Sequence, residues 1–131
     1  MKKTTILHPD ISRVVACMGH TDRLVVADAG LPIPPRVERI DLALTQGVPS
    51  FLETLSAVLT ELKVERIMIA SEMRQASPGL YRAIENLLPN VPVQEVPHEM
   101  FKVETQSARA VIRTGEFTPY ANIILCSGVV F

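Results

Sequence analysis

The chain has 131 residues, within the usual size of one domain, and is long enough to bury a core of its own. Its 13 basic and 14 acidic residues leave a net charge of -1, without a basic run, which excludes the electrostatic footprint of a nucleic-acid binder. No apolar run approaches the roughly 20 residues that a bilayer-spanning helix needs. We therefore expect small-molecule or protein partners, with neither nucleic acid nor a membrane among them.

The start of the chain and its cysteines favour the cytoplasm. The segment Met1 to Leu7 begins with charge but continues into no long apolar region and no small-residue cleavage site, so we expect no signal peptide. Cys17 and Cys126 lie far apart in apolar surroundings, without metal or redox spacing. We expect both to be small buried side chains in a reducing cytoplasm, and we expect no structural zinc site.

The composition also predicts self-association. Aromatic residues make up only 5%, tryptophan is absent and the mean hydropathy is +0.24, so small aliphatic side chains are in surplus. Large exposed apolar patches are rare on monomers, which leads us to expect an oligomer. Chain ends are usually polar and frayed, whereas this one finishes on Val129-Val130-Phe131. We expect that segment to be buried, in the chain's own core or against another subunit.

The first predicted elements place two polar residues beside a sheet. Pro9 to Met18 has the i, i+3, i+4, i+7 apolar spacing of an amphipathic helix, which we expect Gly19 to end in the left-handed conformation. His20 would then follow a helix C-terminus. Leu24 to Ala27 is short and β-rich, and it predicts a buried strand that carries Asp28 at its carboxyl end. In open α/β sheets, ligands collect at that end.

The rest of the chain alternates strands and helices. Ser50 and Glu53 have the spacing of a capping box at the start of an apolar-striped helix that extends to Leu62. The other expected elements are strands at 37–44, 66–70, 91–96, 110–112 and 122–131, and helices at 78–88 and 98–106. This alternation predicts a single α/β domain over residues 1–131, with a three-layer α/β/α arrangement around a mixed, mostly parallel sheet. We expect the sheet to be mixed because the turn between the last two strands is too short for a parallel crossover.

Four short polar segments are candidates for chemistry. They are Gly19 to Asp22, Asp28 with the glycine and proline connector after it, His98, and the turn from Tyr120 to Asn122. Each has an ordinary structural explanation. The helix dipole favours a histidine just beyond a helix C-terminus, turns and caps commonly contain Asp, Asn and Tyr, and His98 could simply open a helix. Residue type alone therefore does not separate a site from local structure.

Taken together, the two histidines suggest acid and base chemistry. The helix dipole favours the protonated form of His20, beyond a C-terminus, and the neutral form of His98, near an N-terminus. If both border one pocket, they would supply a proton donor and a proton acceptor near neutral pH. The chain has no Gly-rich phosphate loop, no nucleophile elbow and no metal-ligand cluster. What remains is proton transfer on a neutral, hydroxyl-rich small molecule.

Four motifs resemble the D-ribose pyranase family, in order and at matching intervals across essentially the whole chain. They are Gly19-His20-Thr21-Asp22, Asp28-Ala29-Gly30-Leu31-Pro32-Ile33-Pro34, Pro97-His98-Glu99-Met100-Phe101-Lys102, and Arg113-Thr114-Gly115-Glu116-Phe117-Thr118-Pro119-Tyr120-Ala121-Asn122-Ile123-Ile124-Leu125. The first and last are long enough to be specific, whereas residues 71–91 match nothing diagnostic. His8 stands where we expect Asn in relatives, and no role in the site falls to it.

The resemblance implies an enzyme that converts the pyranose ring of D-ribose to the furanose ring, so that imported sugar reaches a kinase acting on furanose. It implies no cofactor, and a cytoplasmic, ring-shaped homodecamer with sites at subunit contacts. By the family pattern the proton donor is His20, with Lys102 as a weaker addition to the site. The sugar-binding residues of that pattern are Asp28, His98, Tyr120 and Asn122. The turn with Tyr120 and Asn122 would then face a pocket that includes another chain's His20.

Three alternatives stay open. The sister branch of fucose mutarotases shares Gly-His, Asp-Ala and Tyr-x-Asn. It has Gly in place of Thr21, His in place of Gly30 and no Phe-Thr-Pro before the tyrosine, so the ribose branch is favoured. A non-catalytic sugar-binding regulator would use the same contact residues. A purely structural oligomer explains the apolar chain end but not the polar residues gathered beside it.

Overall fold

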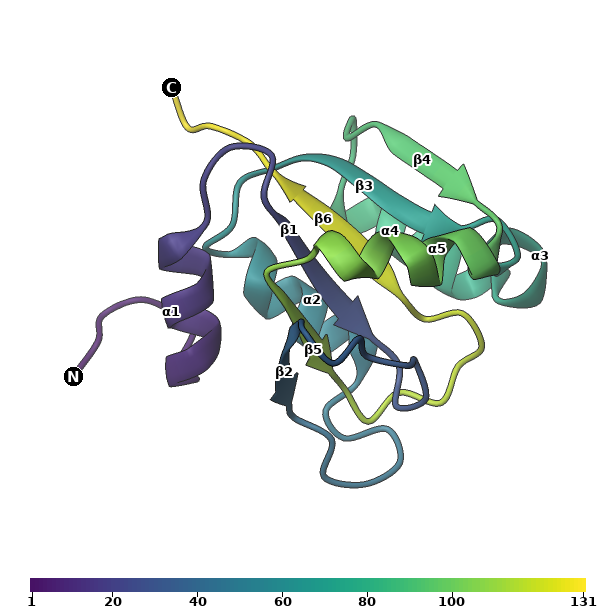
Figure 1. Cartoon of the computed structure of the whole chain (residues 1–131), viewed down its shortest axis with the longest axis horizontal. Helices are drawn as coiled ribbons and strands as arrows, with labels where there is room; N and C mark the ends of the chain where they lie inside the picture. The colour runs from purple at the N-terminus through teal and green to yellow at the C-terminus, as the bar shows by residue number, and fades with distance from the viewer.

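A six-stranded sheet forms the middle of the computed structural model, which describes residues 1–131 (Figure 1). In spatial order its strands are β2, β5, β1, β6, β3 and β4. Their bounds are β1 Arg23–Ala27, β2 Glu38–Asp41, β3 Val64–Ala70, β4 Val93–Val96, β5 Ala110–Arg113 and β6 Ile123–Ser127. All the expected strands are present, although β2, β4 and β6 are shorter than the sequence pattern indicates.

The sheet is mixed and mostly parallel, as predicted. β6 pairs antiparallel with β1 and β3, whereas the pairs β1–β5, β2–β5 and β3–β4 are parallel. The last two strands are nevertheless not neighbours, because β1 lies between β5 and β6. Our inference that a short turn joins two adjacent strands is therefore wrong. The connection over residues 114–122 instead passes the end of β1, which puts its polar residues beside Asp28.

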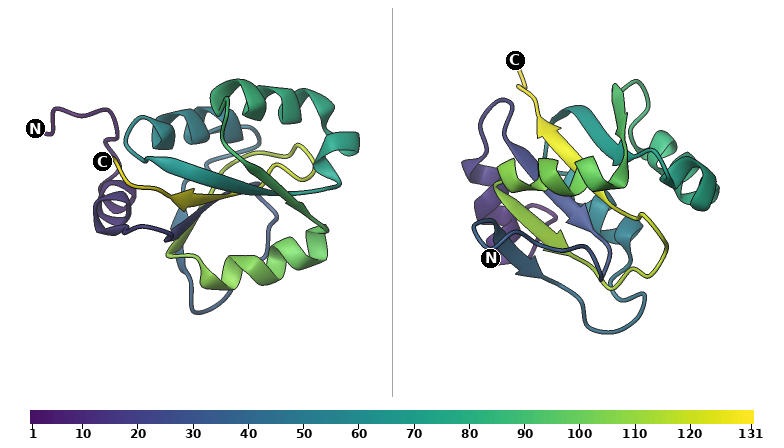
Figure 2. Two further views of the ribbon diagram at one scale, coloured as in Figure 1. Left: turned by 90° about the horizontal axis from the view of Figure 1, so that it is seen from above. Right: turned by 45° about the vertical axis from the view of Figure 1, so that its right-hand side comes forward.

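Helices cover both faces of the sheet, which confirms the three-layer arrangement. One face packs against α1 (Pro9–Cys17), α2 (Phe51–Leu59), α4 (Pro78–Leu87) and the short α3 (Met73–Ala76), which the sequence analysis missed. The other face packs against α5 (His98–Glu104), which continues into a 3-10 turn at Thr105–Ser107. Figure 2 shows α2 and α4 over one face and α5 over the other.

Alternating side chains of the strands fill the two halves of the core. Along β1, Leu24 and Val26 join the larger apolar cluster with residues of α1, α2 and α4. Val25 and Ala27 join the smaller cluster with Phe101 of α5. These four of the five β1 side chains are 0% exposed, as is typical of a central strand with helices on both faces. The carboxyl end of β1 is therefore held firmly from both sides.

The predicted helix starts are confirmed. At α2 the Ser50 hydroxyl accepts the backbone N–H of Glu53, and the Glu53 carboxylate accepts the backbone N–H of Ser50, which completes the capping box. Pro9 and Pro78 occupy the first turns of α1 and α4, where the missing N–H of proline costs no helical hydrogen bond.

The expected end of the first helix is wrong in its details. α1 ends at Cys17, the cap residue Met18 is extended, and Gly19 does not adopt the left-handed conformation. Thr21 carries the positive φ instead, at 69°. The turn is held by Asp22, whose Oδ2 accepts the Gly19 N–H at 2.9 Å, so a left-handed glycine is not needed.

One prediction of burial is wrong, and one of the two alternatives for the chain end is excluded. Cys17 is exposed because it lies at the last position of α1, off the apolar stripe, whereas Cys126 on β6 is buried. The chain end does not enter its own core: β6 stops at Ser127, Val130 is 86% exposed and Phe131 is fully exposed. Burial against another subunit remains the prediction for this tail. None of the helices combines the length and the apolar character needed to cross a bilayer.

Candidate active site

One edge of the sheet gathers four of the predicted site residues. The parallel strands β1, β3, β4 and β5 end at this edge, and β6 begins there because it runs the opposite way. Asp28 directly follows β1, and His98 follows β4 after one proline. Tyr120 and Asn122 lead into β6. We call these four residues the edge cluster; α/β folds commonly bind ligands at the carboxyl ends of their strands.

Asn122 and Asp28 form a reciprocal pair within the edge cluster. The Asn122 Nδ2 donates to Asp28 Oδ2 at 2.7 Å, and the Asp28 backbone N–H donates to Asn122 Oδ1 at 2.9 Å. The other carboxylate oxygen, Asp28 Oδ1, accepts the Gly30 N–H at 2.9 Å. Asn122 is 0% exposed, whereas Asp28 is only partly buried. The buried amide thus fixes the orientation of a carboxylate that solutes can reach.

His98 enters the edge cluster as the first residue of α5. Its backbone N–H donates to both carboxylate oxygens of Glu72, at 3.1 and 3.0 Å. This bond is the main cause that holds the pKa of Glu72 below its usual value. The imidazole packs edge-on against Tyr120, with 5.2 Å between ring centroids, and its buried Nδ1 has no hydrogen-bond partner. Buried polar atoms without a partner are rare, and functional sites are one place where they occur.

The turn that carries Tyr120 is held by hydrogen bonds on both sides. Tyr120 has a φ of 59°, which is uncommon for a bulky side chain. Its carbonyl oxygen accepts the Asn122 N–H at 2.8 Å, and the Pro119 carbonyl accepts the Ser77 hydroxyl at 2.8 Å. The backbone of the turn therefore sets the position of the phenol ring against His98.

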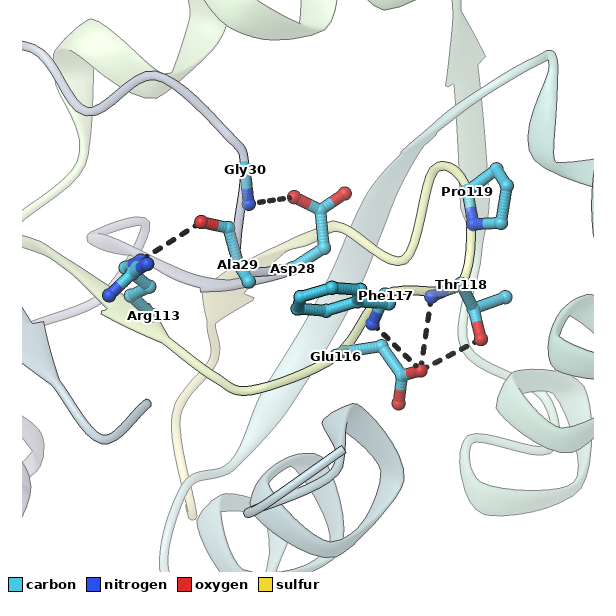
Figure 3. A pocket seen from close by; sticks show the side chains of 8 residues that line it. All are labelled: Asp28, Ala29, Gly30, Arg113, Glu116, Phe117, Thr118 and Pro119. Carbon is cyan, nitrogen blue, oxygen red and sulfur yellow. Dashed lines mark hydrogen bonds between the residues drawn. The ribbon is translucent and has the colours of Figure 1, made fainter. Parts of the chain in front are cut away.

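A pocket of about 400 Å³ opens beside the pair of Asp28 and Asn122 (Figure 3). This volume lies within the about 300–1,000 Å³ that small-molecule sites usually have. The turn after β1 and the turn before β6 form its walls. The lining residues are Asp28, Ala29, Gly30, Arg113, Glu116, Phe117, Thr118 and Pro119. His98, Tyr120 and Asn122 do not line it, so the edge cluster borders this pocket through Asp28.

His20 lies at the opposite edge of the sheet. It precedes β1, whose five residues separate it from Asp28 by roughly 15 Å or more. The neighbouring Thr21 N–H donates to the Ser127 carbonyl at 2.9 Å, at the far end of β6. The exposed imidazole has its Nε2 2.8 Å from Oε2 of Glu65. One chain therefore does not bring His20 together with the edge cluster, and the two histidines do not border one pocket within it.

Lys102 lies one helical turn beyond His98 on α5, and therefore on the same side of that helix. Its Nζ is 2.7 Å from Oε1 of Glu99, and 31% of its side chain is exposed. The lysine is thus close to the edge cluster but bound to a carboxylate of its own helix.

Three charged residues at the same edge have no role among the predicted site residues, although two of them belong to the last sequence motif. Glu72 holds the backbone of His98, as described above. Arg113 donates from Nε to the Ala29 carbonyl at 3.0 Å and ties the turn after β1 to β5. Glu116 accepts hydrogen bonds within the turn before β6. The signal that could have found the first two is their place just after β3 and at the end of β5. No group of three or more His, Cys, Asp or Glu side chains is arranged to hold a metal ion.

Sequence relatives agree with the resemblance over the whole chain. The model of the RbsD / FucU transport protein family matches residues 1–130. A D-ribose pyranase of Coprothermobacter proteolyticus is 56% identical over 131 residues, and the alignment covers 100% of both chains. A D-ribose pyranase of Laribacter hongkongensis is 55% identical over 131 residues, again with 100% of both chains covered.

Solved structures show the same fold. The chain is similar to Bacillus subtilis RbsD complexed with D-ribose, with a TM-score of 0.98, 45% sequence identity and 100% of both chains covered. It is also similar to the fucose mutarotase in complex with L-fucose from Streptococcus pneumoniae, with a TM-score of 0.76, 27% identity and 95% of both chains covered. The resemblance carried by the four sequence motifs is confirmed, and the chain belongs to the RbsD / FucU transport protein family.

Proposed function

We propose that this chain interconverts the pyranose and furanose rings of D-ribose, as an intramolecular isomerase in which residues 1–131 act as one catalytic domain. Relatives named D-ribose pyranase that are 56% and 52% identical over the full length support the reaction. The observation that carries the proposal is the hydrogen-bonded pair of Asp28 and Asn122, at the sheet edge where α/β folds commonly bind ligands. An oriented, accessible carboxylate beside a small pocket suits a hydroxyl-rich sugar.

The reaction consists of proton transfers on a hemiacetal. In ring opening, the anomeric hydroxyl loses a proton while the ring oxygen gains one and its bond to the anomeric carbon breaks, which leaves an open-chain aldehyde. Reclosure through a different hydroxyl runs the same steps in reverse, so atoms and electrons balance without a cofactor. Because sugars open unaided in water, acid and base contributions of about 10²–10⁴ each are sufficient. We assign the role of proton donor to His20.

The edge cluster binds the sugar in this proposal. The Asp28 carboxylate, oriented by the buried Asn122 amide, accepts hydrogen bonds from sugar hydroxyls. The imidazole of His98 and the hydroxyl of Tyr120 supply further polar contacts, since the two rings pack together and both residues are partly exposed. Lys102 joins the site by exchanging its bond to a glutamate of α5 for one to the sugar.

We propose that the His20 of each site comes from a second copy of the chain. In one chain His20 lines, with the tail Val129–Phe131, a separate pocket of about 430 Å³ at the opposite edge of the sheet. An exposed apolar tail beside an exposed histidine suits a contact between copies. A contact that joins one edge to the opposite edge is head-to-tail, and such contacts build a closed ring when the rotation between copies closes. We propose a ring of ten copies.

The ribose branch is favoured over the fucose branch. Sequence identity is 45% to Bacillus subtilis RbsD but 27% to the fucose mutarotase of Streptococcus pneumoniae. Thr21, Gly30 and Phe117–Pro119 also agree with the ribose pattern. We propose a cytoplasmic location, where the furanose form would supply a kinase that phosphorylates the sugar. The two free cysteines suit such a reducing compartment.

Saturation-transfer NMR on D-ribose tests the activity. The protein should raise the rate at which magnetisation passes between the pyranose and furanose signals, and it should do so more for D-ribose than for L-fucose. A protein that binds D-ribose without raising this rate would be a sugar-binding regulator, and the enzymatic proposal would fail.

The variant His20→Ala tests the proton donor. We expect it to lose most of the ring exchange while it keeps the fold and still binds D-ribose. His8→Asn is the matched control, because Asn also caps a helix start well and His8 lies at the cap of α1, away from the edge cluster. Undiminished exchange in His20→Ala would remove His20 from the mechanism.

A further inference from the structure

The Glu116 carboxylate lies in the wall of the sugar pocket, yet the proposed reaction does not use it (Figure 3). Its Oε1 accepts the Thr118 hydroxyl at 2.7 Å, the Thr118 N–H at 3.1 Å and the Phe117 N–H at 3.2 Å. Its Oε2 accepts the backbone N–H of Phe51 at 3.1 Å. Donors from two separate segments of the chain therefore converge on one side chain.

The backbone of Glu116 makes a link to the opposite wall of the pocket. Its carbonyl oxygen accepts the N–H of Ala29, the residue after Asp28, at 2.9 Å. Its N–H donates to the Thr114 hydroxyl at 3.2 Å, and that hydroxyl donates to the Ala27 carbonyl at 2.7 Å. A displacement of Glu116 would therefore move the turn that carries Asp28.

Glu116 keeps its negative charge although it is partly buried. Burial pushes the pKa of the carboxyl up, but the hydrogen bonds from the Thr118 hydroxyl and from the N–H groups of Phe51, Thr118 and Phe117 outweigh it and leave the pKa below its usual value. Phe51 is the first residue of α2, so its N–H is one of the donors that a helix start leaves unpaired, where negative charge is favoured. The helix thus gives the carboxylate a rigid anchor.

We propose that Glu116 is a positioning residue of the sugar pocket, a role that rests on the proposed function. It anchors the wall Phe117–Pro119 to the start of α2 and holds that wall at a set distance from Asp28. Helix capping alone does not explain its hydrogen bonds, because α2 already has a complete cap in the box of Ser50 and Glu53. Irregular turns need such anchors, since a misplacement of about 1 Å can reduce catalysis about 100-fold.

Substitutions of nearly constant size test this role. Glu116→Gln places an amide NH2 against backbone donors, so at least one segment loses its acceptor. Thr118→Val removes the hydroxyl that Glu116 accepts, and Thr118→Ser keeps it. Glu53→Gln is the matched control, because it makes the same change at the start of the same helix but away from the pocket.

Ring exchange at several D-ribose concentrations gives kcat and KM for each variant. We expect KM to rise at least about tenfold in Glu116→Gln and Thr118→Val, with a smaller fall in kcat because the proton donor is untouched. Thr118→Ser and Glu53→Gln should stay within about twofold of the wild type. Equal losses in Glu53→Gln and Glu116→Gln, or wild-type KM in both Glu116→Gln and Thr118→Val, would overturn the proposal. If Glu116→Gln does not fold, the two Thr118 variants decide.

A separate readout distinguishes this proposal from the proposed function. If the wild type itself does not speed ring exchange, the proposed function fails, and the amide NMR signal of Ala29 decides whether Glu116 positions the pocket. That signal should shift in Glu116→Gln and not in Glu53→Gln. An Ala29 signal that stays in place in Glu116→Gln would overturn the positioning role.

Discussion

Replacing Asn122 with aspartate turns one buried amide into a carboxylate at almost constant volume. In the native protein the amide nitrogen donates to Asp28 Oδ2 at 2.7 Å. An ionised aspartate has no proton to donate, so Asn122→Asp sets two carboxylates against each other at hydrogen-bond distance. Because Asn122 is 0% exposed, water cannot screen the new charge from its own side.

Two limits set the size of the effect. At about 4 Å and an effective dielectric constant of about 20, two unit charges repel by about 4 kcal/mol. The variant can instead keep one proton between the two carboxylates. Protonating a carboxyl of ordinary pKa near 4 at pH 7 costs about 1.4 kcal/mol per pH unit, again about 4 kcal/mol in all. Solvent weakens the repulsion because Asp28 is partly exposed, so we expect the free energy of unfolding to fall by about 2–4 kcal/mol at pH 7.

The loss of unfolding free energy in Asn122→Asp should become smaller as the pH falls. Two facing carboxylates are harder to ionise in the folded protein than in the unfolded chain, so their penalty is present at pH 7 and fades as the pH falls toward about 4. Denaturant unfolding at pH 7 and pH 5, at one protein concentration, measures the difference. The exposed Asn86→Asp on α4 is the control and should stay within about 0.5 kcal/mol of the wild type. A loss that does not depend on pH, or one below about 1 kcal/mol at pH 7, would contradict the pairing of Asn122 with Asp28.

Three further predictions concern local structure. Ser50→Ala should cost about 1 kcal/mol in thermal denaturation, because it removes the cap of α2; an unchanged melting temperature would contradict this. The hydrogen bond from the Gly19 N–H is the main cause that holds the Asp22 pKa below its usual value, and the hydrogen bond from the Arg109 side chain is the second. The stabilisation that ionised Asp22 gives to the fold is present above the unfolded pKa of about 3.9 and is lost as the pH falls through the lower folded pKa. The amide NMR signal of Gly19 should therefore titrate below about pH 3.9 and not above it. Gly115→Ala should cost about 1–3 kcal/mol, because its Cβ would lie 2.7 Å or less from backbone atoms of a neighbouring loop. Gly79→Ala meets nothing within 4 Å, and an equal loss in both glycine variants would contradict the reasoning.

Most of the helices and strands could be predicted because the sequence signals for them are local. The spacing of Ser50 and Glu53 is enough to start α2, and the β-rich run before Asp28 is enough to make a strand. The order of the strands is not local. It depends on which apolar faces pack together, so no spacing in the chain shows that β1 lies between β5 and β6. The short α3 was missed because Met73–Ala76 is too brief for a helical period to be read.

In the candidate site, too, local features could be predicted from the sequence and long-range contacts could not. That Asp28 ends a strand follows from the sequence, but its contact with Asn122 joins residues 94 positions apart, and no local pattern indicates it. Asn122 is therefore predicted from the sequence only as a sugar contact, whereas its amide also orients Asp28. The position of His20 follows from the predicted strand, because the residues before and after β1 must lie at opposite edges of the sheet. The hypothesis that His20 and His98 border one pocket of the same chain does not agree with that placement.

Mixed oligomers test most directly the central claim, that the edge cluster of one copy is completed by His20 of another. We expect His20→Ala and Asp28→Asn each to be inactive alone. The two variants are unfolded together in equal amounts and refolded. If the two sides of a site come from different copies, about a quarter of the sites in a random mixture carry both intact sides. The control is the wild type refolded with a double variant that carries both His20→Ala and Asp28→Asn. If the two sides of a site come from different copies, about a quarter of the control's sites are intact. If both sides belong to one chain, about half of them are intact. We predict that D-ribose ring exchange returns to about a quarter of the wild-type rate in the mixture of single variants. No recovery there, together with about half activity in the control, would contradict a shared site.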